Sequence, residues 1–300
     1  MWEAVEREYD SYDLAYLDRI NELINKLGEK GIYTLVDAHQ DVFSRHYCGE
    51  GMPAFYATGK DVEHECEGWL LPFILKTKGI CKSIKDYNFR KDAQGFPLIE
   101  DCNAHFFARY YGTPEAMSAF DWLYNNIGGL QERYLKYWNV VADKFASNPF
   151  VVGYDPINEP FIGNFLKDPT MLIPGSMDLN QLQPMYEKVF KVYEKYDDEK
   201  IMFYEPVQTP DTFAVLGGLI FPTGFTSNPG SDENSRRHAL NDHTYCCEVS
   251  EHMCDDKEPP LDQDETCWDF HQWRLNVRDK DAERYNVPLL ISEFGACTSS

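Results

Sequence analysis

The chain has 300 residues, of which 43% are hydrophobic and 15% aromatic, so it has enough apolar material for a folded core and too much for a disordered protein. Its formal net charge of −22 would repel the phosphate backbone of DNA or RNA, and we expect no nucleic-acid partner. No run approaches the ~18 apolar residues of a membrane-spanning helix. Residues 1–6 are acidic and do not have the pattern of a signal peptide.

The first part of the chain contains one helix, one strand and a long irregular region. Apolar residues recur at helical spacing over residues 12–30, and a buried strand is predicted at residues 32–36. Residues 44–118 break into Gly, Pro, Cys and aromatic clusters, which predicts a long loop insertion that forms a lid or a substrate wall. Its apolar run at residues 69–75 is expected to pack under the loop or to line a groove for lipid.

The rest of the chain alternates helices with strands. Helices are predicted at residues 119–145, 182–196 and 268–285, strands at residues 151–155, 201–206, 239–246 and 287–295, and loops at residues 207–236, with an apolar segment at 213–221, and 254–264. About five strands that alternate with helices imply a parallel sheet with right-handed crossovers.

This alternation predicts an α/β fold of the (β/α)8 (TIM) barrel class. A closed barrel needs eight strands, whereas the chain starts with expected strand-end residues at Trp2–Glu3 and stops just after Glu293. We therefore expect a barrel truncated at both ends, with about strands 3–7 present. Residues 1–300 would form one catalytic domain that carries the insertion at residues 44–118.

The nine cysteines lack the paired spacing of a zinc site and indicate disulfides in an oxidising compartment. The odd count leaves one thiol free, or its partner outside this chain. This usage favours a secreted, extracellular or lysosomal protein.

Two glutamates stand at the ends of predicted strands, where barrel enzymes place their catalytic groups. Glu159 lies in a stiff turn between Pro156 and Pro160, and Glu293 ends the last strand. A glycosidase generally needs two carboxyl groups, and these two strand ends would supply them. A separation of roughly 5–5.5 Å would retain the anomeric configuration, and roughly 6.5–9.5 Å would invert it.

We assign Glu159 as the general acid/base and Glu293 as the nucleophile. Because the two carboxylates repel each other, one of them is expected to be protonated, which suits Glu159 as the acid. Glu205, in Tyr204-Glu205-Pro206, resembles the Glu159 turn and is the chief rival, but it lacks the preceding Asn and is given a supporting role.

Three polar residues are expected close to these glutamates. Asn158 could bind the sugar 2-hydroxyl, or it could simply cap the turn. Tyr245 could donate its phenol to Glu293, and His243, two residues earlier on the same strand, would point the same way. Without the glutamates, His243 would more readily be interpreted as a core histidine.

Asp37, His39 and Asp41 follow the first predicted strand and invite a metal interpretation. Zinc usually takes three or four protein ligands, and no second histidine cluster accompanies these residues. Hydrogen bonds from this group to sugar hydroxyls are the preferred interpretation, so we expect neither a metal nor another cofactor.

Four stretches together resemble glycoside hydrolase family 5, and within it the endoglycosylceramidase branch. They are Asn158-Glu159-Pro160, Ser292-Glu293-Phe294-Gly295, and residues 35–44 and 49–55. The resemblance implies a retaining enzyme that splits oligosaccharide from ceramide in glycosphingolipids without a metal. It also implies a monomer that touches a membrane or micelle surface transiently.

By motif, the resemblance places Asp37, His39 and Asp41 in the sugar subsite, and His243 and Tyr245 beside the nucleophile. The family's second-strand Arg would precede Met1, its eighth-strand Trp would follow Ser300, and its C-terminal β-sandwich is absent from the sequence. Three other functions stay open: a family 5 β-glucosidase or sterol glucosidase, a glycolipid-binding protein without turnover, and a metal-dependent barrel hydrolase.

Overall fold

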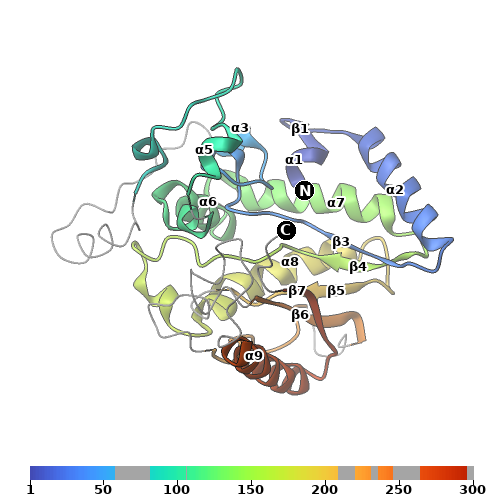
Figure 1. Cartoon of the computed structure of the whole chain (residues 1–300). Helices are drawn as coiled ribbons and strands as arrows, with labels where there is room; N and C mark the ends of the chain where they lie inside the picture. The colour runs from blue at the N-terminus through green and yellow to red at the C-terminus, as the bar shows by residue number, and fades with distance from the viewer. Residues whose placement is uncertain (58–81, 106, 209–219, 231–235, 246–263, 296–300) are drawn as a thin grey trace.

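The computed structural model describes residues 1–57, 82–105, 107–208, 220–230, 236–245 and 264–295, and helices alternate with strands along these ranges (Figure 1). The α-helices are α1 Trp2–Val5, α2 Leu14–Gly28, α3 Ala54–Ala57, α5 Ile99–Cys102, α6 Pro114–Tyr124, α7 Leu130–Phe145, α8 Gln183–Tyr193 and α9 Asp264–Tyr285. The strands are β1 Glu6–Glu8, β2 Ser11–Tyr12, β3 Thr34–Asp37, β4 Val151–Asp155, β5 Ile201–Tyr204, β6 His238–Tyr245 and β7 Leu289–Gly295.

Five of the strands form one parallel sheet in the order β3-β4-β5-β6-β7. This spatial order repeats the order in the sequence, as in consecutive strands of a (β/α)8 barrel. At the two ends of the sheet, Asp37 pairs with Asp155 and His243 pairs with Glu293. The prediction of about five parallel strands is confirmed, and the carboxyl ends of all five meet along one edge.

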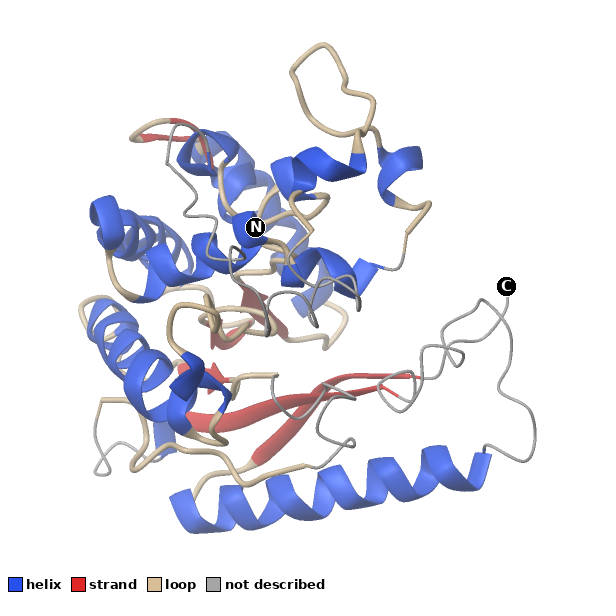
Figure 2. Ribbon diagram, turned by 90° about the vertical axis from the view of Figure 1, so that its left-hand side faces the viewer, coloured by secondary structure: helices blue, strands red, loops and turns tan. Residues whose placement is uncertain are grey.

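The long helices lie beside the sheet and brace its strands. Helix α7 packs against α2, α6 and α8, and α9 runs alongside β6 and β7 (Figures 1 and 2). On α7, the buried Trp138 donates from Nε1 to the carbonyl of Pro156 at 3.2 Å, and Tyr134 donates to the same oxygen. Helix α7 thereby holds the turn that follows β4.

The single helix predicted at residues 119–145 is wrong, because α6 and α7 are separate helices. A short 3₁₀ turn, η4 Ile127–Gly129, lies between them, and Asn126, Gly128 and Gly129 have φ of 53°, 65° and 77°. Such positive values end a right-handed helix, and glycine adopts them without steric cost. The apolar spacing resumes beyond the break, so periodicity alone did not reveal it.

The expected strand end at Trp2–Glu3 is also wrong. Residues Trp2–Val5 form the one-turn helix α1, and the indole of Trp2 donates to Glu6 Oε2 at 2.7 Å. An antiparallel hairpin of β1 and β2 follows. A single turn is too short to show helical periodicity, which explains the error.

The insertion at residues 44–118 holds short helices rather than a continuous loop. Besides α3 and α5 it contains the 3₁₀ turns η1 Arg45–Tyr47, η2 Ile84–Tyr87 and η3 Phe107–Gly112, and α6 begins within it. A disulfide joins Cys48 to Cys102 and closes this region on itself. The apolar run at residues 69–75 and most of the segments at 213–221 and 254–264 lie outside the described residues. None of the described helices is both long and apolar enough to cross a membrane.

Candidate active site

The turn after β4 presents Glu159 in an unusual backbone conformation. Its φ of 40° lies in the left-handed region that residues with a Cβ rarely adopt. Gln40 fixes the turn by donating from Nε2 to the carbonyls of Asn158 and Glu159 at 2.7 and 3.1 Å. Asn158 returns a hydrogen bond from Nδ2 to the Gln40 carbonyl at 3.0 Å. The side chain of Asn158 thus ties the turn to the segment after β3.

Glu293 lies on β7, beside the end of β6. The phenol of Tyr245 donates to Glu293 Oε2 at 2.8 Å, which is the contact predicted from the sequence. Parallel pairing sets this geometry, because Tyr245 is paired with Gly295 and His243 with Glu293. The phenol holds one oxygen of the Glu293 carboxylate in place.

The side chains of Glu159 and Glu293 converge on His243. One carboxylate oxygen from each glutamate and a ring nitrogen of His243 all lie within 4.8 Å of one another. The Glu159 and Glu293 side chains are 27% and 34% exposed, so a solute can reach both, whereas His243 is 1% exposed. These two oxygens lie closer together than the roughly 6.5–9.5 Å of inverting enzymes, on the side of the roughly 5–5.5 Å range of enzymes that retain anomeric configuration.

His243 bridges the two carboxylates from behind. Its Nδ1 lies 2.8 Å from Glu159 Oε1 and 3.6 Å from Glu293 Oε2, and its Nε2 lies 3.0 Å from Ser292 Oγ. Burial would lower the pKa of His243, but the hydrogen bond to Glu159 and the charges of Glu159, Glu293 and Asp155 raise it overall. A protonated imidazole would hold the two carboxylates close despite their mutual repulsion.

Two buried carboxyl groups behind this site were not predicted as a pair. Asp155 ends β4 and Glu205 follows β5, and burial together with neighbouring acidic groups raises the pKa of each well above its usual range. Asn241 donates to Asp155 Oδ2 at 2.7 Å, and the backbone N–H of Glu159 donates to Glu205 Oε2 at 3.0 Å. The sequence places both residues at strand ends, but it does not show that their carboxyl groups lie close together.

A buried ion cluster fixes β6 from the helix side. Asp242 accepts hydrogen bonds from Arg274 at 2.8 and 2.9 Å and from Arg278 at 2.8 Å. Burial would raise the pKa of Asp242, but the two guanidinium groups hold it at about 2. Asp242 precedes His243, so this cluster sets the position of the bridging histidine. Arginines four residues apart on one helix face were the signal that sequence reasoning missed.

Asp37, His39 and Asp41 come together as the motif suggested. His39 Nδ1 lies 2.9 Å from Asp37 Oδ2, and its Nε2 lies 3.4 Å from Asp41 Oδ2. Tyr111, which stacks on Phe161 just after the Glu159 turn, donates its phenol to Asp41 Oδ1 at 3.3 Å. Tyr111 was not predicted, and it links this group to the Glu159 turn.

Two groups of acidic and histidine side chains are compact enough to be considered as metal sites. They are His39 with Asp41 and Glu50, and His243 with Glu159 and Glu293. Each ring nitrogen of the two histidines lies 2.8–3.4 Å from a carboxylate or hydroxyl oxygen, and hydrogen bonds account for all of these contacts. The described part of the chain therefore favours hydrogen bonding by these side chains over metal coordination.

We expect His39 to make the free energy of unfolding fall as pH rises through the range of about 6.5 to 10. The hydrogen bonds to Asp37 and Asp41 raise its pKa from 6.5 to about 10. Since the folded state binds this proton more tightly than the unfolded chain, the contribution is complete below the unfolded pKa and is lost as pH passes the folded one. Urea unfolding measured across this range would show it. His39→Gln should abolish this part of the slope, whereas His46→Gln, the matched control, should keep it; an unchanged slope in His39→Gln would contradict the assignment.

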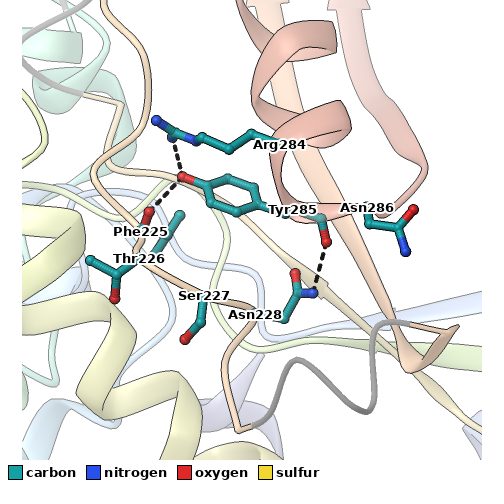
Figure 3. A pocket seen from close by; sticks show the side chains of 7 residues that line it. All are labelled: Phe225, Thr226, Ser227, Asn228, Arg284, Tyr285 and Asn286. Atoms are coloured by element: carbon teal, nitrogen blue, oxygen red, sulfur yellow. Dashed lines mark hydrogen bonds between the residues drawn. The ribbon is translucent and has the colours of Figure 1, made fainter.

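A separate cavity of about 560 Å³ lies where α9 ends and β7 is about to begin (Figure 3). Tyr285 spans it, accepting from Asn228 Nδ2 at its carbonyl at 3.0 Å and donating its phenol to the Phe225 carbonyl at 2.8 Å. Arg284 is paired with Asp281 at 3.0 Å. Tyr285 precedes β7 and Glu293 lies near the end of that strand, so this cavity is at the opposite end of the sheet from the paired glutamates.

Comparison with known proteins places this chain in a family. The family described as Cellulase (glycosyl hydrolase family 5) matches residues 1–300. The chain belongs to glycosyl hydrolase family 5. The predicted (β/α)8 barrel class is therefore confirmed, and the strand ends that carry Glu159 and Glu293 are strand ends of a family 5 barrel.

Within family 5, the chain is similar to proteins named endoglycoceramidase. It is 37% identical over 236 residues to one from Hydra vulgaris, covering 79% of this chain and 41% of the relative. It is 34% identical over 285 residues to one from Cyanea nozakii, covering 95% of this chain and 48% of the relative. The chain thus spans about half the length of these curated relatives, and the resemblance to the endoglycosylceramidase branch is confirmed.

A solved structure shows the same fold. Endo-glycoceramidase II from Rhodococcus sp., in complex with ganglioside GM3, superposes with a TM-score of 0.63 at 25% identity. The superposition covers 96% of this chain and 56% of that one.

Proposed function

We propose that this family 5 chain carries the catalytic carboxyl groups of a retaining glycosidase that releases oligosaccharide from ceramide in glycosphingolipids. The observation that carries the proposal is the convergence of Glu159 and Glu293 within 4.8 Å around one buried histidine. The names of the Hydra and Cyanea relatives support the substrate class. So do the Rhodococcus enzyme's structures with ganglioside GM3 and as a lactosyl-enzyme intermediate.

In the first step, the free oxygen of Glu293 attacks the anomeric carbon while Glu159 protonates the ceramide oxygen. The bond between sugar and ceramide breaks, and the glycan is held as an ester of Glu293. Tyr245 occupies Oε2 of Glu293, so Oε1 is the oxygen placed to attack. His243 occupies Oε1 of Glu159, so Oε2 is the oxygen placed to transfer the proton.

In the second step, Glu159 removes a proton from water, which attacks the same anomeric carbon. The ester bond to Glu293 breaks, and the glycan leaves with its original configuration after two inversions. Asp37, His39 and Asp41 would bind sugar hydroxyls during both steps. Asn158, whose Nδ2 donates to Gln40, would offer its remaining polar atoms to the 2-hydroxyl.

Product analysis tests this function and separates it from its rivals. Ganglioside would be incubated with this chain and with the chain extended at both ends to the length of its relatives. Free ceramide together with intact oligosaccharide supports the proposal. Free glucose from simple or sterol glucosides would favour the other family 5 activity, and binding without turnover in the extended protein would favour a glycolipid-binding role.

Glu159→Ala should depend strongly on the leaving group. We expect ganglioside hydrolysis to fall by about 10²–10⁴-fold, the usual contribution of general acid–base catalysis. A dinitrophenyl lactoside needs no protonation to leave, so its first step should survive, and azide should restore turnover because it attacks without a general base. Steady-state rates and the configuration of the glycosyl azide would be measured. Equal losses on both substrates, with no azide rescue, would show that Glu159 is not the acid/base.

The Cys48–Cys102 disulfide supports an oxidising location, secreted, extracellular or lysosomal. A glycosphingolipid substrate would also require transient contact with a membrane or micelle surface, because the ceramide portion lies in the lipid phase.

A further inference from the structure

Glu205 lies directly behind the paired glutamates and contacts the acid/base turn. It is 1% exposed, whereas the side chains of Glu159 and Glu293 are 27% and 34% exposed, so Glu205 lies beneath the surface that the paired glutamates form. Its Oε2 accepts the backbone N–H of Glu159 at 3.0 Å, and its Oε1 lies 3.4 Å from His243 Nε2. One carboxyl group therefore contacts both the residue that would donate the proton and the histidine that holds that residue's side chain.

The surroundings of Glu205 are strongly acidic. Asp37 from β3, Asp155 at the end of β4, Glu159 in the following turn and Asp242 from β6 all face it, and His243 is the basic group in contact. The charge of Asp155 is the largest of these influences on Glu205, and two buried carboxyl groups so close together cannot both ionise without a large electrostatic cost. Burial and these charges raise the pKa of Glu205 well above its usual range. A neutral carboxyl group can accept the Glu159 N–H without repelling the reactive carboxylates.

On the basis of the proposed function, we propose that Glu205 is a positioning residue that holds the Glu159 turn in its left-handed conformation and keeps the Glu159 side chain against His243. A non-glycine residue with positive φ costs on the order of 1–3 kcal/mol unless its surroundings enforce it. Gln40 donates to the carbonyls of Asn158 and Glu159, and Glu205 accepts the hydrogen bond from the Glu159 N–H. Without the second contact, the Glu159 carboxyl would lose its defined distance from His243.

The first test follows His243 directly by NMR and needs no enzyme activity. The chain would carry isotope-labelled histidine, and His243→Gln would identify the signal among the eight histidines. Glu159→Gln should lower the titration midpoint of His243 by about one pH unit, because a hydrogen-bonded charge is removed. Glu205→Leu should lower it by a similar amount, and the double variant by no more than Glu159→Gln alone, within about 0.3 unit.

Two further variants keep this test decisive. Glu205→Gln retains an oxygen that can accept the Glu159 N–H, so it should preserve the His243 midpoint even if Glu205→Leu fails to fold. Tyr186→Phe is the matched control, because Tyr186 donates to the backbone carbonyl of Glu205 at 2.9 Å and has no bond to Glu159. An unmoved midpoint in Glu205→Leu, a further shift in the double variant, or a Glu205→Gln shift equal to that of Glu159→Gln would overturn the proposal.

The second test uses leaving groups in the full-length enzyme. Glu205→Leu should lose at least about tenfold more activity on ganglioside than on a dinitrophenyl lactoside, because only the first requires a positioned acid. Glu205→Gln should recover most of that difference. A loss equal on both substrates would indicate a general structural role and contradict the positioning role. If the wild-type enzyme hydrolyses neither substrate, the proposed function fails, and the NMR result still decides whether Glu205 positions Glu159.

Discussion

Glu293→Gln should abolish hydrolysis, with a loss on the order of 10⁴-fold or more for every leaving group. Glutamine keeps the shape of the side chain and can still accept from Tyr245, but it cannot form the ester with the anomeric carbon. Unlike the loss in Glu159→Ala, this one cannot be rescued by a better leaving group. Initial rates on ganglioside and on a dinitrophenyl lactoside would measure it.

A mechanism-based inactivator provides the independent control for this prediction. A 2-fluoro glycoside should attach to Glu293, and mass spectrometry of the peptides would locate it. Glu132→Gln is the matched variant, since Glu132 is an exposed carboxylate on α7 whose side chain accepts a hydrogen bond from Asn126. It should retain activity and labelling. Label found on Glu205 alone would mean that the nucleophile has been misassigned.

Asp242→Leu should destabilise the fold by about 3–5 kcal/mol, the usual cost of leaving a buried charge without its partner. Asp242 is fully buried and accepts hydrogen bonds from Arg274 and Arg278, so its loss would leave two buried guanidinium groups facing an apolar side chain. Urea unfolding at neutral pH would measure the change. Replacing both arginines by methionine in the same variant should recover part of the loss, because an apolar cluster needs no ion pairing.

The same cluster predicts a dependence on acid. The pKa of Asp242 in the folded chain is about 2, below the ordinary 3.8. Its stabilising contribution is therefore present above the unfolded pKa and is lost as pH falls through the folded one. Asp242→Leu should lack this part of the acid unfolding curve. Asp143→Leu, on helix α7, would serve as the control for removing a carboxylate, and equal destabilisation by both would contradict the role of Asp242.

The sequence predicted the sheet well because buried parallel strands are continuous apolar runs separated by amphipathic helices. It predicted the convergence of Glu159, Glu293, His243 and Tyr245 for a related reason, since parallel strands bring their carboxyl ends to one edge. Local periodicity was insufficient at η4, where Gly128 and Gly129 reverse the backbone between two helices with the same apolar spacing.

Contacts between distant residues were the part that sequence reasoning could not supply. The pair of Asp155 and Glu205, and the cluster of Asp242 with Arg274 and Arg278, depend on which side chains meet across the sheet. Asn158 was predicted to bind the sugar or to cap its turn, and the sequence did not show that its Nδ2 donates to the Gln40 carbonyl. The sequence can place a residue at the end of a strand, but it does not show which neighbouring side chain or backbone group that residue contacts.

The left-handed backbone at Glu159 has a consequence for how this chain can change over time. Glycine would adopt that conformation without steric cost, so a substitution of Glu159 by glycine would relieve the backbone strain and remove the carboxylate. A side chain at this position costs conformational free energy, which contacts elsewhere in the fold must offset. A relative that no longer hydrolyses sugars would not need this carboxylate. We would therefore expect glycine at this position early in the change from an enzyme to a binding protein.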